Sequence, residues 1–217
     1  MTKHQDTRDI RREYQLNTLS FDQLSSDPLQ QFGHWMHDVV DAGITDATAM
    51  TLATCNRDGI PSARIVLLKH HDENGFCWYT NFASHKGQDL AQNPVASLLF
   101  YWHALDRQVR ITGAVSKLPD ELADQYFHSR PRESQIGAIA SAQSAPLNDR
   151  QQLETAVEDL QQRYADDSEV IPRPDFWGGY RLQPTQFEFW QGREDRLHDR
   201  FIYQQEAGQW NIQRLAP

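Results

Sequence analysis

The first part of the chain has the apolar spacing of a helix. Apolar residues recur every three or four positions at Leu29, Phe32, Met36, Val39 and Val40. Asp27-Pro28 favours a helix start, because Asp accepts hydrogen bonds from free N–H groups and Pro suits the first turn. The pattern therefore predicts a helix that begins at residue 28 and that Gly43 ends.

From residue 48 the apolar residues come in short runs that turn residues separate. These runs predict strands over residues 48–55, 60–69, 76–81, 95–102, 107–118, 180–192, 200–206 and 210–215. Two of the intervening turns read NRDG and HDENG. Helical patterns cover residues 84–93, 119–128, 132–144 and 148–165.

The order of these segments indicates the fold class. Strands joined by short turns imply an antiparallel sheet, and closure into a barrel removes its exposed edges. We therefore predict an α+β fold in which helices pack outside an antiparallel β-barrel. Residues 1–20 are polar and are expected to form an N-terminal arm, followed by a single domain over residues 21–217.

Charge and composition exclude several classes of protein. The 217 residues include 21 Lys and Arg against 30 Asp and Glu, a net charge of −9, which disfavours non-specific nucleic-acid binding. No apolar run reaches the ~20 residues of a membrane helix, and the N-terminus lacks the apolar core of a secretory signal. We expect a cytoplasmic protein that binds neither nucleic acid nor a membrane, with Cys55 and Cys77 as reduced thiols.

Common catalytic motifs are missing from the sequence. It contains no GxGxxG, GxxxxGK[ST], GxSxG or HExxH, which disfavours a Rossmann dehydrogenase, a P-loop enzyme, an α/β-hydrolase and a zinc protease. The histidine pairs His34/His37 and His70/His71 have no further ligands at metal spacing. No metal site is therefore expected.

Two clusters near the predicted strands could bind anions. Arg64 and Lys69 flank an apolar strand, which suggests anions at its two rims; a strand whose ends simply reach solvent would look the same. Residues 79–86 lead from a strand end to a helix start, where Ser84 and Lys86 could cradle a phosphate. The alternative there is a plain Ser cap beside an exposed Lys.

Two further clusters lie in the second half of the chain. Tyr126, Arg130 and Ser134 would share one face of a continuous helix and could bind a phosphate, although Pro131 disturbs that helix. A solvated helix junction is the alternative. Residues 190–200 place three Arg and one His beside a Trp, which suits a flat anionic ligand. The alternative is a charged hairpin loop.

Taken together, these clusters resemble a known family. The strings RREY, ARIVLLK, SLLFYWH, YFHSRPRESQIGA, FWGGYR, FWQGREDRLHDR and the terminal RLAP occur in order from Arg11 to Pro217. This series is similar to the pyridoxamine 5′-phosphate oxidase family. The resemblance implies a split β-barrel that binds FMN at a homodimer interface. It also implies oxidation of pyridoxamine 5′-phosphate and pyridoxine 5′-phosphate to pyridoxal 5′-phosphate, in which O2 becomes H2O2 and the amine yields ammonia.

The resemblance also implies roles for individual residues. FMN would be held by Arg64, Ile65, Val66, Leu67, Leu68, Lys69, Tyr79, Thr80, His85, Lys86, Gln108, Gln143, Ser144, Trp190 and Arg200. The substrate would be held by Arg11, Arg12, Glu13, Tyr14, Lys69, Tyr126, Arg130, Ser134, Arg196, Leu197 and His198. The segment from Arg11 to Tyr14 would fold over the substrate as a lid, and Arg196 and His198 would be catalytic.

One position departs from the family pattern. The family often has Arg where this chain has His85, and imidazole is shorter and mostly neutral at pH 7. Lys86 remains, so we expect weaker, pH-dependent binding of the FMN phosphate.

Other functions fit parts of the sequence. A split-barrel flavin reductase with a nicotinamide donor would need FMN, but neither the Tyr126/Arg130/Ser134 set nor the loop that contains Arg196. A non-catalytic FMN- or pyridoxal 5′-phosphate-binding protein would bind its ligand without turnover; the presence of Arg196 and His198 argues for catalysis.

Overall fold

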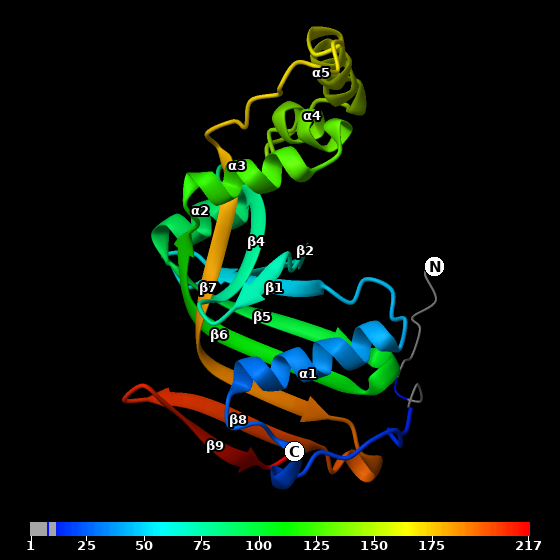
Figure 1. The fold of residues 1–217 in the computed structure, drawn as a ribbon, viewed down its shortest axis with the longest axis vertical. Coiled ribbons are helices and arrows are strands. Elements are labelled where there is room, and N and C mark those ends of the chain that lie inside the picture. The colour runs from blue at the N-terminus through cyan, green and yellow to red at the C-terminus, as the bar shows by residue number, and fades with distance from the viewer. Residues whose placement is uncertain (1–7, 9–11) are drawn as a thin grey trace. The chain divides into compact units, whose positions relative to one another are not determined.

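The predicted strands pair into one sheet in the computed structural model, which describes residue 8 and residues 12–217 (Figure 1). The strands are β1 (Ala49–Cys55), β2 (Pro61–Leu67), β3 (His70–Asp72), β4 (Gly75–Asn81), β5 (Val95–Trp102), β6 (Arg107–Lys117), β7 (Trp177–Gln191), β8 (Asp199–Glu206) and β9 (Gln209–Leu215). Their order is β2-β1-β5-β6-β7-β4-β3, and β8 pairs with both β7 and β9. The pairs β1–β2, β3–β4, β4–β7, β7–β8 and β8–β9 are antiparallel.

Five helices accompany the sheet in the described part of the chain. They are α1 (Pro28–Asp41), α2 (His85–Gln92), α3 (Asp120–Ser129), α4 (Arg132–Ala140) and α5 (Arg150–Arg163). Short 3-10 turns occur at Phe21–Gln23, His103–Leu105 and Glu194–Arg196. None of these helices is long and apolar enough to cross a membrane.

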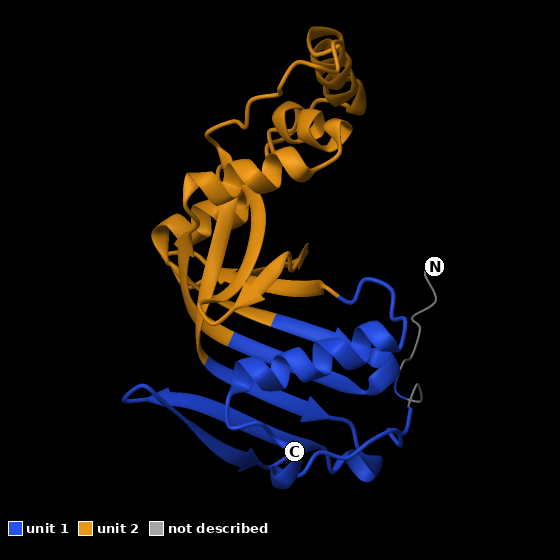
Figure 2. Ribbon diagram, viewed as in Figure 1, with its two compact units in different colours: residues 1–47, 99–111, 186–217 blue, residues 48–98, 112–185 orange. Residues whose placement is uncertain are grey.

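The chain divides into two compact units (Figure 2). The first comprises residues 1–47, 99–111 and 186–217, and the second comprises residues 48–98 and 112–185. Of the predicted N-terminal arm, residues 1–7 and 9–11 lie outside the described residues. The predicted boundary between an arm and a single domain stays a prediction.

Aromatic side chains form the core of the first unit. Phe32 and Trp35 of α1 contact Phe100 and Phe189, with ring centroids 5.0 and 5.2 Å apart. All four rings are almost fully buried, so α1 packs through the apolar stripe that its sequence predicts. The predicted ends of this helix are also confirmed. The Leu29 N–H donates to the Asp27 side chain, and Gly43 adopts a φ of 64° just after the last turn.

The second unit contains two buried clusters. Its strands bury apolar residues that include Met50, Leu52, Trp78, Leu98 and Leu182. A separate cluster joins α3, α4 and α5 to the start of β7 through Phe127, Ile136, Tyr164, Ile171 and Trp177. Trp177 thus fixes the three helices beside the end of β4, with which the start of β7 pairs.

Several predicted bounds differ from the structure: β7 begins at Trp177 and not at residue 180, and α4 ends at Ala140 and not at residue 144. The strand expected over residues 60–69 ends at Leu67, and part of the expected turn HDENG forms β3 instead. The reason is that His70 pairs with Cys77 across a tight hairpin, in which the Asn74 N–H donates to Asp72.

The predicted break at Pro131, between the helices expected over residues 119–128 and 132–144, is confirmed. Helix α3 ends at Ser129, and α4 begins at Arg132. Arg130 between them is extended, with φ −79° and ψ 151°. A clash with the proline ring disfavours the helical region for the residue before it, so Pro131 favours this break.

Candidate functional site

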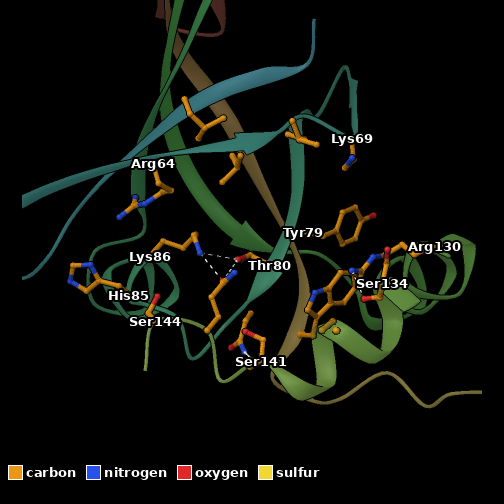
Figure 3. Close-up of a pocket in the computed structure, with 18 of the residues that line it drawn as sticks. Arg64, Lys69, Tyr79, Thr80, His85, Lys86, Arg130, Ser134, Ser141 and Ser144 are labelled. Carbon is orange, nitrogen blue, oxygen red and sulfur yellow. Dashed lines mark hydrogen bonds between the residues drawn. The ribbon is translucent and has the colours of Figure 1, made fainter. Parts of the chain in front are cut away.

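A cavity of about 960 Å³ lies in the second unit (Figure 3). Its wall comes from β2, β4, the first turn of α2, the α3–α4 junction, α4 and the loop that follows it. Fourteen predicted site residues line it: Arg64, Ile65, Val66, Leu67, Lys69, Tyr79, Thr80, His85, Lys86, Tyr126, Arg130, Ser134, Gln143 and Ser144. Leu68 is buried and does not line this cavity. The structure therefore gathers the first three sequence clusters around one space.

Lys86 is a buried cation at one end of this cavity. Its side-chain Nζ donates to Gln143 Oε1 at 2.8 Å, to Ser84 Oγ at 3.1 Å and to Thr80 Oγ1 at 3.2 Å. All three acceptors are neutral. Burial, and to a smaller extent the charge of Arg64, lower the pKa of Lys86 to about 8. A buried ammonium without a carboxylate partner favours a bound anion.

Ser84 supports Lys86 instead of capping the helix with its side chain. It occupies the N-cap position of α2, but its Oγ donates to the Asn81 carbonyl at 2.6 Å and accepts from Lys86. Lys86 is itself 8% exposed. The alternative of a plain Ser cap beside an exposed Lys is therefore wrong.

Arg64 lies at the β2 side of the cavity. Its guanidinium donates to the Leu52 carbonyl at 3.0 Å and to Thr54 Oγ1 at 2.7 Å, and it also contacts Ser62. Burial lowers its pKa, an effect that the charge of Asp89 opposes. These contacts hold the side chain against β1 and β2 and leave its charge only partly compensated.

Asp89 is a central residue that the sequence analysis missed. Its buried carboxylate accepts from Thr54 at 2.6 Å and lies 3.9 Å from both Arg64 and His85. The exposed imidazole of His85 is thus oriented by a carboxylate at the cavity rim. The effect of His85 on the binding of FMN stays a prediction.

Arg130 marks a second cationic point in the cavity. Its Nη2 donates to the Ser134 carbonyl at 2.6 Å, whereas its Nη1 is buried and has no hydrogen-bond partner. The guanidinium lies 4.9 Å from the centre of the Trp177 ring. Burial lowers the pKa of Arg130, and Tyr126 opposes this effect. An unpaired buried N–H is costly, so this position favours an anionic oxygen.

An aromatic stack lies beside Arg130. Tyr79 and Tyr126 are stacked with ring centroids 4.0 Å apart, and Tyr79 also stacks on Trp177 at 5.6 Å. Lys69 approaches the Tyr126 ring, with Nζ 5.9 Å from its centre. Although no continuous helix joins Tyr126, Arg130 and Ser134, all three line the same wall. The alternative of a merely solvated helix junction is therefore wrong.

Seven residues of the cavity wall were not predicted. They are Ser62, Ala63, Asn81, Gly137, Ala138, Ser141 and Trp177. Most are small or neutral, so residue type alone gives no signal for them. Trp177 belongs to the conspicuous string FWGGYR, and its placement next to Arg130 could have been suspected from the cation–aromatic pattern used for residues 190–200.

The fourth sequence cluster forms a separate group in the first unit. Trp190 and His198 have ring centroids 4.7 Å apart, and Tyr14 meets both rings edge-on at 5.6 and 5.4 Å. Nδ1 of His198 accepts from the Arg193 backbone N–H at 3.1 Å, which leaves its proton on Nε2. Burial and the nearby Arg196 and Arg200 lower the pKa of His198, so it is neutral at pH 7.

The loop before His198 has an unusual backbone. Asp195 and Arg196 have φ values of 54° and 64°, in the left-handed region that non-glycine residues rarely adopt. The side chains of Arg196 and Leu197 are exposed. Strain of this kind is typical of functional loops, because the surrounding contacts must enforce it.

The remaining predicted residues occupy different environments. Arg200 donates to the buried Glu188 at 2.9 Å and to the Ala216 carbonyl at 2.8 Å. Gln108 is half-buried in β6, and Glu13 is exposed. Arg11 lies outside the described residues. Most of the described site residues thus fall in two groups, the cavity wall of the second unit and the cluster of Tyr14, Trp190 and His198 in the first.

The predicted site residues carry no cluster of metal ligands. Among the described residues, no three His, Cys, Asp or Glu side chains come together in a way that could hold a metal ion. The chemistry of both groups is that of cations, hydroxyls and aromatic rings. These groups suit a flat anionic organic molecule.

Comparisons with known proteins agree with this geometry. The family profile described as pyridoxamine 5′-phosphate oxidase matches residues 36–164, and the profile of a pyridoxine 5′-phosphate oxidase C-terminal dimerisation region matches residues 177–217. A pyridoxine/pyridoxamine 5′-phosphate oxidase of Salinibacter ruber is 51% identical over 96% of this chain and 98% of its own length. The enzyme of the same name from Idiomarina loihiensis is 48% identical over 98% of this chain and 100% of its own.

A solved structure shows the same fold. PhzG from Burkholderia lata, in complex with tetrahydrophenazine-1-carboxylic acid, is 29% identical, with a TM-score of 0.87 over 95% of this chain and 100% of that one. The predicted α+β fold with an antiparallel split barrel is confirmed. The chain belongs to the pyridoxamine 5′-phosphate oxidase family.

Proposed function

We propose that this protein oxidises pyridoxamine 5′-phosphate and pyridoxine 5′-phosphate to pyridoxal 5′-phosphate, with FMN as cofactor and O2 as electron acceptor. The observation that carries the proposal is that one cavity holds two cations that lack an anionic partner: the buried Lys86, whose hydrogen-bond acceptors are all neutral, and Arg130, whose buried Nη1 has no acceptor. Two phosphates, one on the cofactor and one on the substrate, would satisfy both. The relatives named above act on these substrates, which supports the assignment.

The residues around Lys86 fit the phosphate of FMN. Lys86 and Arg64 supply positive charge, and Thr80, Gln143 and Ser144 add polar groups at the same end. This end lies at the first turn of α2, where free N–H groups favour anions. When bound, FMN supplies the acceptor for two electrons and a proton from the substrate carbon C4′.

The residues around Arg130 fit the phosphate of the substrate. The unpaired Nη1 of Arg130 can donate to a phosphate oxygen, and Lys69, Tyr126 and Ser134 line the same wall. In this proposal, Arg196 and His198 line the pyridine ring and orient C4′. His198 carries its proton on Nε2, so it can donate a hydrogen bond to the substrate but cannot repel a cation.

The overall reaction balances with water and oxygen. Pyridoxamine 5′-phosphate, O2 and water give pyridoxal 5′-phosphate, ammonia and H2O2; the alcohol substrate needs no water and releases no ammonia. The matched dimerisation region supports a homodimer. We propose that FMN binds at its interface, together with Trp190, Arg200 and Gln108. The cytoplasmic location stays a prediction.

The alternative functions explain less of the structure. A flavin reductase with a nicotinamide donor has no use for the unpaired Arg130 in the α3–α4 junction. A non-catalytic binding protein has no need of the Arg196 and His198 pair that the family resemblance makes catalytic. Neither alternative is favoured by the relatives.

The proposal can be tested by product analysis. The protein is loaded with FMN and incubated in air with pyridoxamine 5′-phosphate, and pyridoxal 5′-phosphate, ammonia and H2O2 are measured. We expect equal amounts of all three products. Pyridoxamine without the phosphate is the matched control and should react only at much higher concentration. Formation of none of the products by the FMN-loaded protein would contradict the proposal.

A further inference from the structure

Asp106 is a buried acid that belongs to none of the predicted sites. It lies between β5 and β6, its φ is 53°, and it is 1% exposed. Its carboxylate forms an ion pair with Arg12, whose side chain is half-exposed and also donates to the His103 carbonyl at 3.2 Å. The two residues are 94 positions apart in sequence. A buried carboxylate strongly favours keeping such a partner, because an unpaired charge is poorly solvated there.

Arg12 connects this acid to Tyr14. The guanidinium carbon of Arg12 lies 4.9 Å from the centre of the Tyr14 ring. Tyr14 in turn meets the rings of Trp190 and His198 edge-on. Its fit is close, because a Cβ atom on Gly192 would lie 2.8 Å from the Tyr14 ring.

The backbone of Asp106 holds the opposite side of the same contact. Its carbonyl accepts from the Gly192 N–H at 2.8 Å and from Gln191 Nε2 at 3.2 Å. Asp106 therefore fixes the end of β7, on which Tyr14 rests, through its main chain. Through its side chain it fixes the segment that carries Tyr14. One residue thus joins both sides of the contact.

We propose that Asp106 is a positioning residue for substrate binding: through Arg12 it holds Tyr14 against His198 and Trp190. This inference rests on the proposed function and on the lid over the substrate that the family resemblance implies for the segment from Arg11 to Tyr14. The conformation of Asp106 suits this role, since Asp and Asn tolerate the left-handed region better than most residues. Loss of its charge releases residues 12–14 and leaves the end of β7 in place.

The first test compares Asp106→Asn with Asp38→Asn in the FMN-loaded protein. Asn preserves the size and the backbone conformation but removes the charge. Asp38 is the matched control, because it is an exposed acid of the same unit whose ion pair with Arg107 does not involve residues 12–14. We expect Asp106→Asn to raise the KM for pyridoxamine 5′-phosphate about tenfold, with little change in kcat or in the Kd for FMN. Asp38→Asn should change none of these.

Limited digestion with trypsin tests the contact without substrate. Cleavage after Arg12 should be faster in Asp106→Asn than in the unaltered protein, whereas sites elsewhere should be cut at unchanged rates. A merely structural role would instead lower Tm and accelerate cleavage throughout the chain. Because this assay needs no turnover, it tests the role of Asp106 even if the proposed oxidase activity is absent.

Arg12→Gln completes the test from the exposed side of the pair. Arg12→Gln should raise the KM for pyridoxamine 5′-phosphate to a similar extent. The KM of the double variant should be no higher than that of either single variant, because the pair acts as one unit. This variant also keeps the proposal testable if Asp106→Asn does not fold. Independent, additive effects of the two substitutions, or an unchanged KM and unchanged cleavage after Arg12, would overturn the proposal.

Discussion

Individual cations in this protein differ in whether a carboxylate compensates them. Arg173 donates to Asp124 at 2.6 Å and to Asp120 at 2.8 Å, and these bonds outweigh burial to raise its pKa. Lys86 and Arg130 have no such bond to an acid, and burial lowers the pKa of each. Arg173 is therefore a structural cation, whereas Lys86 and Arg130 are prepared for ligands that bring their own negative charge.

The pKa of Lys86 predicts how FMN binding depends on pH. Below pH 8 the ammonium is already charged in the FMN-free protein; above it the amine is neutral and must take up a proton when a phosphate binds. The Kd for FMN should therefore rise with pH above 8, by up to about tenfold per pH unit. Quenching of flavin fluorescence between pH 7 and 9 measures this dependence.

A substitution isolates the contribution of Lys86. Lys86→Met should weaken FMN binding at pH 7 by about 10- to 100-fold and remove the rise above pH 8. Lys117→Met, at an exposed lysine of the same unit, is the matched control and should preserve both. If the Kd of the unaltered protein is the same at pH 7 and 9, Lys86 does not hold the phosphate.

Arg130 predicts a specific effect on the substrate. Arg130→Ala removes the unpaired Nη1 and should raise the KM for pyridoxamine 5′-phosphate by about 10- to 100-fold, the value of a charge-assisted hydrogen bond. Steady-state kinetics with pyridoxamine is the internal control. Because this substrate has no phosphate, its KM should change little in Arg130→Ala. An equal rise in KM for both substrates would show that Arg130 acts through the fold and not through the phosphate.

At the level of elements, the break between α3 and α4 places Arg130 in the cavity wall. Pro131→Ala removes the steric restriction on Arg130 and permits a helical conformation there. We expect a higher KM for the substrate and an unchanged Kd for FMN, because Lys86 lies on a different element. Pro119→Ala, at the start of α3, is the control. An unchanged KM in Pro131→Ala would mean that neighbouring contacts, and not the proline, set the position of Arg130.

Periodicity predicted most of the elements but not the contacts between them. The bounds of β5, and the helix start at Asp27-Pro28, follow from local pattern alone. Local pattern did not predict β3, because that strand exists only through its pairing with β4. Asp89 was missed for the same reason: its partner Thr54 is 35 residues away, and nothing in its own neighbourhood indicates a buried acid.

In the candidate site, too, the sequence predicted which residues take part but not the contacts that they make. The residue types and their spacing identified the cations and aromatic residues of the cavity, as the placement of Lys86 and Tyr126 shows. They did not indicate that Lys86 is buried among neutral oxygens or that Nη1 of Arg130 is unpaired. Both properties arise from packing between distant segments, which one sequence does not reveal.

For the whole molecule, the two groups of site residues predict separable functions. Arg196→Ala alters an exposed side chain of the first unit, whereas Lys86 lies in the second unit. The variant should therefore lower kcat but retain FMN. Flavin content after purification and turnover of pyridoxine 5′-phosphate measure the two effects, and Arg57→Ala, at an exposed turn, is the control. Full turnover by Arg196→Ala would remove Arg196 from the mechanism.

The net charge of −9 means that the binding of phosphates must depend on local cations. An acidic protein repels anionic ligands at long range, so an affinity for two phosphates depends on the few groups that meet them. Lys86, which is buried among neutral oxygens, and Arg130, which is half-buried against Trp177, are such groups.

The central claim is that this protein transfers electrons from a phosphorylated B6 vitamer to FMN and then to O2. An absorbance spectrum of the FMN-loaded protein, taken without oxygen before and after addition of pyridoxine 5′-phosphate, tests it most directly. We predict that the flavin absorbance bleaches on addition of the substrate and returns when air is admitted. A bound flavin whose absorbance does not change with this substrate would contradict the account.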